Sequence, residues 1–157
     1  MANENNKNIE LEWKLKEFEE LSTKELYFIL QLRTEIFVVE QRSICNDLDN
    51  KDLFSAHLMC WENDVLIACA RIIPPGISYQ GFASIGRIVN KQGFRGLGIG
   101  KELVQRAIME VQRKFPEKPI RISGQLYLKK FYESFGFEQT SDVYIEDCID
   151  HIQLTKY

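Results

Sequence analysis

The glycine-rich stretch Arg95–Gly100, with the sequence RGLGIG, constrains the fold of this chain more than any other segment. A strand-like apolar run precedes it, and a helix-like segment follows, in which Leu103, Ala107 and Val111 recur at steps of four. The first turn of a helix has unpaired backbone N–H groups and the positive end of the helix dipole. Glycines also remove the Cβ atoms that would keep a phosphate at a distance. The stretch therefore predicts a diphosphate site at a helix start, to which Arg95 adds a fork of donors.

Two other glycine motifs do not fit the spacing of this stretch. A P-loop requires GxxxxGK followed by Ser or Thr, whereas here Glu102 follows Lys101, and Arg95 stands where the first glycine belongs. A dinucleotide-binding fold requires GxGxxG after the first strand of a parallel unit, whereas this chain has GxGxG late in its sequence. A glycine-rich turn before a buried helix, without any ligand, is the alternative that the glycines alone leave open.

Length and composition are those of an ordinary globular protein. The chain has 157 residues, of which 45% are hydrophobic and 27% charged, and its net charge is −3. This length suits a single domain, which we expect over residues 11–157 after a polar tail at residues 1–10. The charge argues against nucleic acid as a partner, and the spacing of cysteines and histidines predicts no metal site. The polar N-terminus and the lack of a long apolar run predict a cytoplasmic protein without a membrane segment.

Hydrophobic periodicity predicts an α/β chain. Strands are expected at residues 11–18, 56–61, 65–73, 82–89, 120–122, 137–139 and 152–155. Helices are expected from the capping box at residues 22–25 towards residue 37, over residues 98–115, and over residues 125–135. Residues 40–54 are polar and acidic, and they suit either a short helix or a loop. This order of elements predicts one mixed sheet with helices on both faces.

A second segment, QLYLKKFYESFGF at residues 125–137, changes the meaning of the first. Its aromatic residues alone suit a helix packed on a core. However, RxxGxG followed about thirty residues later by FYxxxGF resembles the two-part signature of the GNAT N-acetyltransferases. Five further segments resemble the ElaA-type branch of that superfamily, namely FVVEQ (37–41), ARIIPPG (70–76), SIGRIV (84–89), QLYLKKFY (125–132) and YIEDCIDHI (144–152). The resemblance covers nearly everything after residue 10.

The resemblance implies the GNAT fold, in which a central, mostly antiparallel mixed sheet has helices on both faces and two splayed central strands. It also implies acetyl-CoA as the cofactor, with the pantetheine arm between those strands and the pyrophosphate in the glycine-rich loop. The residues it assigns to acetyl-CoA are Ile88, Val89, Asn90, Arg95, Gly96, Leu97, Gly98, Ile99, Gly100, Lys101, Gln125 and Lys129. Gln125 stands where many relatives carry an Asn, and Lys129 reads equally well as part of a solvated helix face.

Tyr132, within FYESFGF, is implied to be the general acid that protonates the departing CoA thiolate. A phenol with an ordinary pKa of about 10 is neutral at pH 7 and can donate to a thiolate. Some relatives place a basic Glu on the strand before the loop, but this chain carries Arg87 there, so the base must lie elsewhere. The candidates for the base or for acceptor contacts are Glu40, His57, Glu146, Asp147 and His151. Each of these also reads as a loop charge or a core histidine.

The distribution of charge bears on both substrates. Residues 87–106 are basic, whereas residues 40–52 and 142–150 are acidic. A basic segment suits an anionic cofactor, and acidic loops on the acceptor side favour a cationic amine, with solvated loop acids as the alternative. We therefore expect direct attack of a primary amine, on a small molecule or a peptide, on acetyl-CoA without a covalent enzyme intermediate. The resemblance also allows a homodimer.

Two other function classes are compatible with the same motifs. A non-catalytic acyl-CoA-binding or sensor module on the same fold would keep the phosphate loop and transfer nothing, although the presence of Tyr132 argues against it. A nucleotide-binding protein that uses the glycine-rich loop is the weaker alternative. Transfer to amines, and competition between CoA and ATP, distinguish these classes from an N-acetyltransferase.

Overall fold

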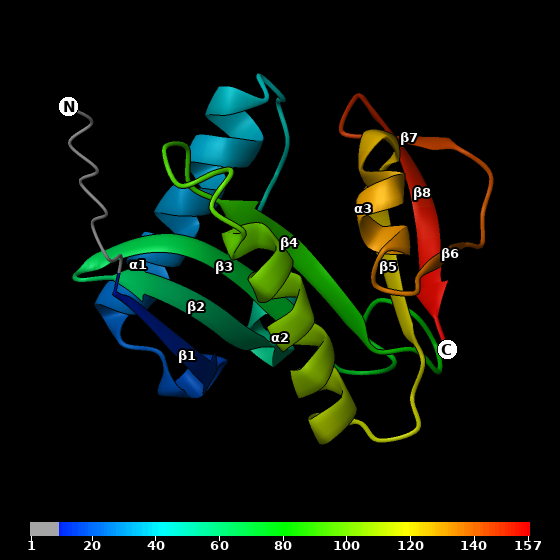
Figure 1. The fold of residues 1–157 in the computed structure, drawn as a ribbon, viewed down its shortest axis with the longest axis horizontal. Coiled ribbons are helices and arrows are strands. Elements are labelled where there is room, and N and C mark those ends of the chain that lie inside the picture. The colour runs from blue at the N-terminus through cyan, green and yellow to red at the C-terminus, as the bar shows by residue number, and fades with distance from the viewer. Residues whose placement is uncertain (1–9) are drawn as a thin grey trace, which may run out of the picture.

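The computed structural model describes residues 10–157, so the expected N-terminal tail lies almost wholly outside the described residues. The strands are β1 (Leu11–Glu17), β2 (Ala56–Glu62), β3 (Val65–Ile73), β4 (Ser84–Asn90), β5 (Ile120–Gln125), β6 (Glu138–Gln139), β7 (Tyr144–Glu146) and β8 (Ile149–Lys156). The α-helices are α1 (Thr23–Arg33), α2 (Ile99–Lys114) and α3 (Lys129–Glu133) (Figure 1). No helix within this part of the chain is long and apolar enough to cross a membrane.

The strands form two antiparallel sheets that meet at one point. The first sheet has the order β1-β2-β3-β4, and the second has the order β5-β8-β6, with β7 paired to β8. Strands β4 and β5 run parallel and approach each other through an isolated bridge between Ala83 and Ile120. Backbone bonds from Ala83 to Pro119 (3.0 Å) and from Arg121 to Ala83 (2.9 Å) hold this junction. The mixed α/β class and the splayed central strands are confirmed, but the expected single sheet is divided where β4 and β5 part.

Helices cover both faces of the first sheet (Figure 1). Helix α1 packs on one face, where Ile29 and Leu32 meet Met59 and Cys69 in one apolar cluster. Helix α2 packs on the opposite face in a larger cluster that also includes Tyr132 of α3 and the inner side chains of β5 and β8. The alternation of strand side chains supplies both clusters, because successive residues face opposite sides. The two sheets thus share one core on the α2 and α3 side.

Local signals explain most element boundaries. Ser22 and Glu25 form the expected capping box at the start of α1. The chain then continues without a break into a π-helical segment, Thr34–Glu40, whose end the sequence pattern did not indicate. A 3₁₀ turn, Leu126–Leu128, precedes α3, so Gln125 ends strand β5 and does not begin a helix as expected. The acidic loop near the C-terminus contains the short strand β7, which was also not expected.

Strand β4 carries a β-bulge at Arg87. Its pairing with β3 shifts register, since Cys69 lies opposite Val89 whereas Arg71 lies opposite Gly86. Arg87 has a φ of 50°, in the left-handed region that non-glycine residues rarely adopt. A bulge leaves the extra residue outside the ladder and bends the strand. Residues 87 and 88 therefore lie opposite a single residue of β3, and the ladder between β3 and β4 is interrupted there.

The left-handed conformation of Gly98, with a φ of 77°, leads to a stability prediction. A Cβ on Gly98 would meet no atom within 4 Å, so the cost of Gly98→Ala is purely one of backbone conformation. We expect a loss of about 1–2 kcal/mol in the free energy of unfolding. Gly100→Ala is the matched control, because Gly100 is helical and its Cβ would make only an ordinary 3.8 Å contact with Asn90. Urea unfolding followed by circular dichroism measures both, and equal losses in the two variants would contradict the prediction.

Candidate active site

A cavity of about 410 Å³ lies where β4 and β5 part. Its walls come from both strands, from the start of α2, from α3, from the segment that follows the π-helix, and from the β7–β8 turn. The lining residues that bear on chemistry are Glu40, Gln41, Cys45, Asp47, Arg87, Ile88, Val89, Asn90, Arg95, Gly100, Ser123, Gln125, Tyr132, Glu146, Asp147 and His151. Eleven of the residues selected from the sequence are among them, so the structure gathers most of the predicted site around one space.

The glycine-rich loop forms one end of this site. Gly96 and Gly98 have positive φ angles, and Gly98 caps α2 without a side-chain bond. The first helical bond runs from the Glu102 N–H to the Gly98 carbonyl (3.1 Å), so the preceding N–H groups have no partner within the helix. Leu97 and Lys101 are exposed. The loop therefore presents free backbone donors and the positive end of a sixteen-residue helix, as a diphosphate site requires.

Arg95 is already engaged beside this loop. Its guanidinium forms an ion pair with Glu40 of the π-helical segment, with Nη2 lying 3.0 Å from Oε2, and its Nε donates to the Asn90 carbonyl (3.3 Å). Both side chains of the pair are partly exposed. A bound phosphate would therefore compete with Glu40 for the guanidinium of Arg95. The sequence did not indicate this ion pair.

The end of β4 fits a pantetheine arm. Ile88, Val89 and Asn90 line the cavity as expected, and Ile88 follows the bulged residue. Asn90 Oδ1 is buried and lacks a hydrogen-bond partner within residues 10–157. A buried carbonyl oxygen without a donor is costly, and an amide N–H of a bound ligand would satisfy it. Gln125, across the gap, also borders the cavity and donates to Gln41 at 3.3 Å.

Tyr132 lies against the bare backbone of β5. An ideal Cβ on Gly124 would come within 3.1 Å of its ring, so only glycine leaves room for the ring at this position. Phe131 and Phe137 contact the ring edge-on and fix its orientation. Burial raises the pKa of Tyr132 to about 12, with a smaller contribution from Tyr127. The phenol therefore stays protonated throughout the neutral range while bordering the cavity.

Glu146 and His151 meet at the opposite side of the cavity. His151 Nδ1 lies 2.7 Å from the Ile149 carbonyl, and because a carbonyl only accepts, Nδ1 carries the hydrogen. In the neutral ring Nε2 then has a free lone pair, and it lies 3.5 Å from Glu146 Oε2. Ser123 donates to the same carboxylate oxygen at 2.9 Å, and Tyr144 donates to Ser123 at 2.5 Å. This chain of bonds fixes the carboxylate and leaves Nε2 able to accept a proton.

The register of β5 places Tyr132 and His151 on opposite faces of the second sheet. The Tyr132 ring covers the face marked by Gly124, whereas His151 is the strand partner of the next residue, Gln125. Successive residues of a strand point to opposite faces, and paired residues point to the same one. The cavity therefore has a proton donor on the α3 side and a proton acceptor on the other side.

The remaining candidates are placed less favourably. His57 is buried, its Nε2 lies 3.0 Å from the Asp52 carbonyl, burial lowers its pKa, and it does not line the cavity. Lys129 binds Gln139 on the far side of α3. Asp147 is exposed at the cavity rim, in the β7–β8 turn.

The acidic segment at residues 40–52 was expected either to favour a cationic acceptor or to hold solvated loop acids. In the structure its acids pair with arginines, as described for Glu40 above and for Asp47, Asp49 and Asp52 below. Ser123 and Arg87 are the site residues that sequence reasoning missed as functional groups. Arg87 lies in the SIGRIV segment, where sequence reasoning assigned it no functional role, and Ser123 lies in none of the quoted segments. Strand pairing brings Ser123 to Glu146.

Comparisons with known proteins agree with this geometry. A family model described as an acetyltransferase (GNAT) domain matches residues 36–157. Protein ElaA of Escherichia coli strain K12 is 36% identical over 148 residues, which is 93% of this chain and 96% of that protein. The crystal structure of an acyl-CoA N-acyltransferase from Pseudomonas aeruginosa superposes with a TM-score of 0.90 at 38% identity, covering 94% of this chain and 100% of that one. That of Escherichia coli ElaA gives 0.89 at 35%, with the same coverage.

These matches confirm the resemblance inferred from the sequence motifs. The family model spans well over half of the chain, and the ElaA match spans nearly all of it. This protein is a member of the GNAT acetyltransferase domain family and is similar to its ElaA-type proteins.

Proposed function

We propose that this protein transfers an acetyl group from acetyl-CoA to a cationic primary amine by direct attack. The observation that carries the proposal is the cavity between β4 and β5, which is bordered by the start of α2 as well as by Tyr132 and His151. Two comparisons support acyl-CoA as the donor, since a similar protein is described as an acyl-CoA N-acyltransferase and the matching family model as an acetyltransferase (GNAT) domain. No covalent enzyme intermediate is required.

The proposed roles at the donor end follow from the free polar groups there. The start of α2 and the loop from Arg95 to Lys101 would hold the pyrophosphate, with Arg95 exchanging Glu40 for phosphate. Asn90 Oδ1 would accept from a pantetheine amide. The backbone N–H at the bulge of β4 would donate to the thioester oxygen as negative charge develops there. The thioester supplies an activated acyl group, and the protein supplies its position.

The amine must lose a proton before or during attack. At pH 7 the free-energy cost of deprotonating an alkyl ammonium with a pKa of about 10.4 is roughly 4.6 kcal/mol. For an α-amino group with a pKa near 7.8 the cost is about 1 kcal/mol. We assign the proton to Nε2 of His151, with Glu146 stabilising the resulting imidazolium. Glu146 and Asp147 also border this side of the cavity and would attract a cationic amine.

The leaving thiolate needs a proton on the other side of the thioester. Tyr132 lines the cavity from the α3 face, and its raised pKa keeps it protonated where a thiolate would form. Acid and base on opposite faces suit a reaction in which the nucleophile enters and the leaving group departs in different directions.

The first test of the proposal is binding and transfer. Calorimetric titration with acetyl-CoA should give saturable binding, and release of CoA thiol should accompany acetylation within a broad panel of primary amines. Absence of binding at millimolar acetyl-CoA would overturn the proposal. Binding without transfer to any amine would indicate a non-catalytic acyl-CoA module, and displacement by ATP as effective as by CoA would indicate a nucleotide site.

Replacing Tyr132 by Phe tests the general acid. Removing only the hydroxyl keeps the ring over Gly124, so we expect kcat to fall about 10²-fold while acetyl-CoA affinity stays nearly unchanged. Tyr127→Phe is the matched control, because Tyr127 lies nearby on the cavity rim but is exposed. Stopped-time thiol assays and calorimetry give the two quantities. Unchanged kcat in Tyr132→Phe would remove this residue from the acid role.

Replacing His151 by Gln tests the base. We expect kcat/KM to fall about 10²–10⁴-fold, because the proposed proton acceptor is lost. His57→Gln is the control, since His57 is the other histidine and does not line the cavity. It should lower stability and leave kcat/KM nearly unchanged. Unchanged kcat/KM in His151→Gln would assign the base elsewhere.

A further inference from the structure

The segment between the π-helix and β2 borders the cavity, and we define its residues 41–50 as the strap. It begins with a turn at residues 41–42 and contains no helix or strand. The burial of its side chains alternates along the whole strap: residues at odd positions are buried or partly buried, and residues at even positions are exposed. The inward residues are Gln41, Ser43, Cys45, Asp47 and Asp49, and the first four of these line the cavity. The apolar Ile44 and Leu48 point outward and are exposed. Polar contacts, and not apolar burial, therefore hold the strap in place.

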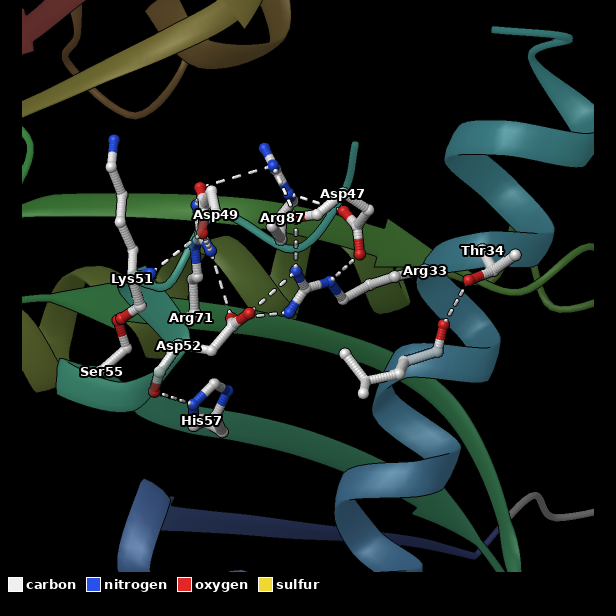
Figure 2. Close-up of polar contacts among 11 residues, drawn as sticks. Arg33, Thr34, Asp47, Asp49, Lys51, Asp52, Ser55, His57, Arg71 and Arg87 are labelled. Atoms are coloured by element: carbon white, nitrogen blue, oxygen red, sulfur yellow. Dashed lines mark hydrogen bonds and ion pairs between the residues drawn. The ribbon is translucent and has the colours of Figure 1, made fainter. Parts of the chain in front are cut away.

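The main polar contact is a closed ring of three arginines and three aspartates (Figure 2). Asp47 bridges Arg33 (2.9 Å) and Arg87 (2.8 Å). Asp49 bridges Arg87 (3.5 Å) and Arg71, which it contacts through both carboxylate oxygens at 2.6 and 2.7 Å. Asp52, just after the strap, bridges Arg71 (3.2 Å) and Arg33 (2.7 Å) and so closes the ring.

The ring joins four parts of the fold. Arg33 ends α1, Arg71 lies on β3, and Arg87 is the bulged residue of β4, whereas the aspartates come from the strap and the turn after it. Arg33 and Arg71 are nearly fully buried. Burial alone would raise the pKa of Asp49, but its hydrogen bonds and charge interaction with Arg71 hold the pKa well below its ordinary value. Three positive charges balance three negative ones, so removing one carboxylate leaves one buried positive charge of the ring without compensation.

The two residues that connect the strap to the β4 bulge both border the cavity. Asp47 and Arg87 both line it, and Arg87 Nη2 also donates to the Asp47 backbone carbonyl (3.0 Å). Arg87 is also the residue of the β4 bulge, whose backbone N–H is the proposed donor to the thioester oxygen. The strap reaches the β7–β8 turn as well, because Ser43 donates to the Asp147 carbonyl at 3.0 Å. The strap thus forms part of the cavity wall, where it contacts both the β7–β8 turn and strand β4.

We propose that Asp47, Asp49 and Asp52 are positioning residues, which act through Arg33, Arg71 and Arg87 to hold the strap against the β4 bulge and so form the acceptor-side wall of the cavity. The identity of that wall as the acceptor side rests on the proposed function. The attachment of the strap by the ring does not, and the experiment below separates the two.

The native cysteines report the attachment directly. Cys45 faces inward on the strap, Cys60 and Cys69 are buried in the sheet, and Cys148 is exposed. In a Cys148→Ser background, iodoacetamide labelling at each remaining cysteine is followed by mass spectrometry. Asp49→Asn is the informative change, because burial, Asp147 and Asp47 raise the pKa of Cys45 whereas Asp49 does not contribute. Asp64→Asn, in the exposed β2–β3 turn, is the matched control.

We expect Asp49→Asn to label Cys45 about tenfold faster than the background protein, with Cys60 and Cys69 still unlabelled and Asp64→Asn without effect. Labelling of all three cysteines would mean that Asp49→Asn unfolds the protein. In that case Arg87→Lys replaces it, since a single ammonium keeps the charge but cannot fork between Asp47 and Asp49. Unchanged labelling of Cys45 in a folded variant would overturn the proposal.

Steady-state kinetics then tests whether the strap shapes the acceptor side of the cavity. In Asp49→Asn the KM for the acceptor amine should rise about tenfold, while the Kd for acetyl-CoA changes less than about threefold. A rise of both constants by the same factor would indicate general loosening and overturn the positioning role. If the wild-type protein transfers acetyl to no amine, the proposed function fails, and the labelling result still decides whether the ring holds the strap.

Discussion

The structure depends on the parting of two parallel strands after a single bridge. Ala83 and Ile120 bring β4 and β5 together through backbone bonds, and beyond that point neither strand pairs with the other. Backbone groups left unpaired in a protein interior must find partners or water. The fold therefore contains two strand edges that face a cavity, and a ligand with its own amides and carbonyl can satisfy them. The bulge at Arg87 strengthens the effect, because it removes further ladder bonds where the strands diverge.

Charges around the cavity are divided between those neutralised by the protein and those left for ligands. The acidic stretch at residues 40–52 is balanced internally, by Arg95 at one end and by the arginine–aspartate ring at the other. Glu146 and Asp147 have no arginine or lysine as an ion-pair partner in residues 10–157. If this side of the cavity receives the amine, as proposed, the charge that attracts it lies at Glu146, which ends β7, and at Asp147 in the turn that follows. This region is smaller than the two acidic segments that the sequence indicated.

The mixed α/β fold and the glycine-rich loop at the start of α2 could be predicted from the sequence because their signals are local. The capping box at Ser22, the period of α2 and the glycines before it each specify structure within a few residues. The acceptor end could not be predicted in the same way. Arg33 and Arg87 lie 14 and 40 residues from Asp47, so no window of sequence contains the contact. The one available signal for the strap was the alternation of side chains along residues 41–50. Its inward-facing residues are mostly polar, whereas periodicity predicts a half-buried strand only where the inward-facing residues are apolar.

The two ion-pair systems flanking the cavity differ in their exposure, and this difference makes them respond unequally to ionic strength. Salt screens charges in contact with water much more than buried ones. The pair between Arg95 and Glu40 is partly exposed and weakens as salt rises, whereas the ring is buried at Arg33, Arg71 and Asp52 and is exposed only in part at Arg87 and Asp49. Raising the salt concentration would therefore loosen the pair beside the glycine-rich loop before it loosens the ring. The two ends of the cavity would thus respond to ionic strength to different degrees.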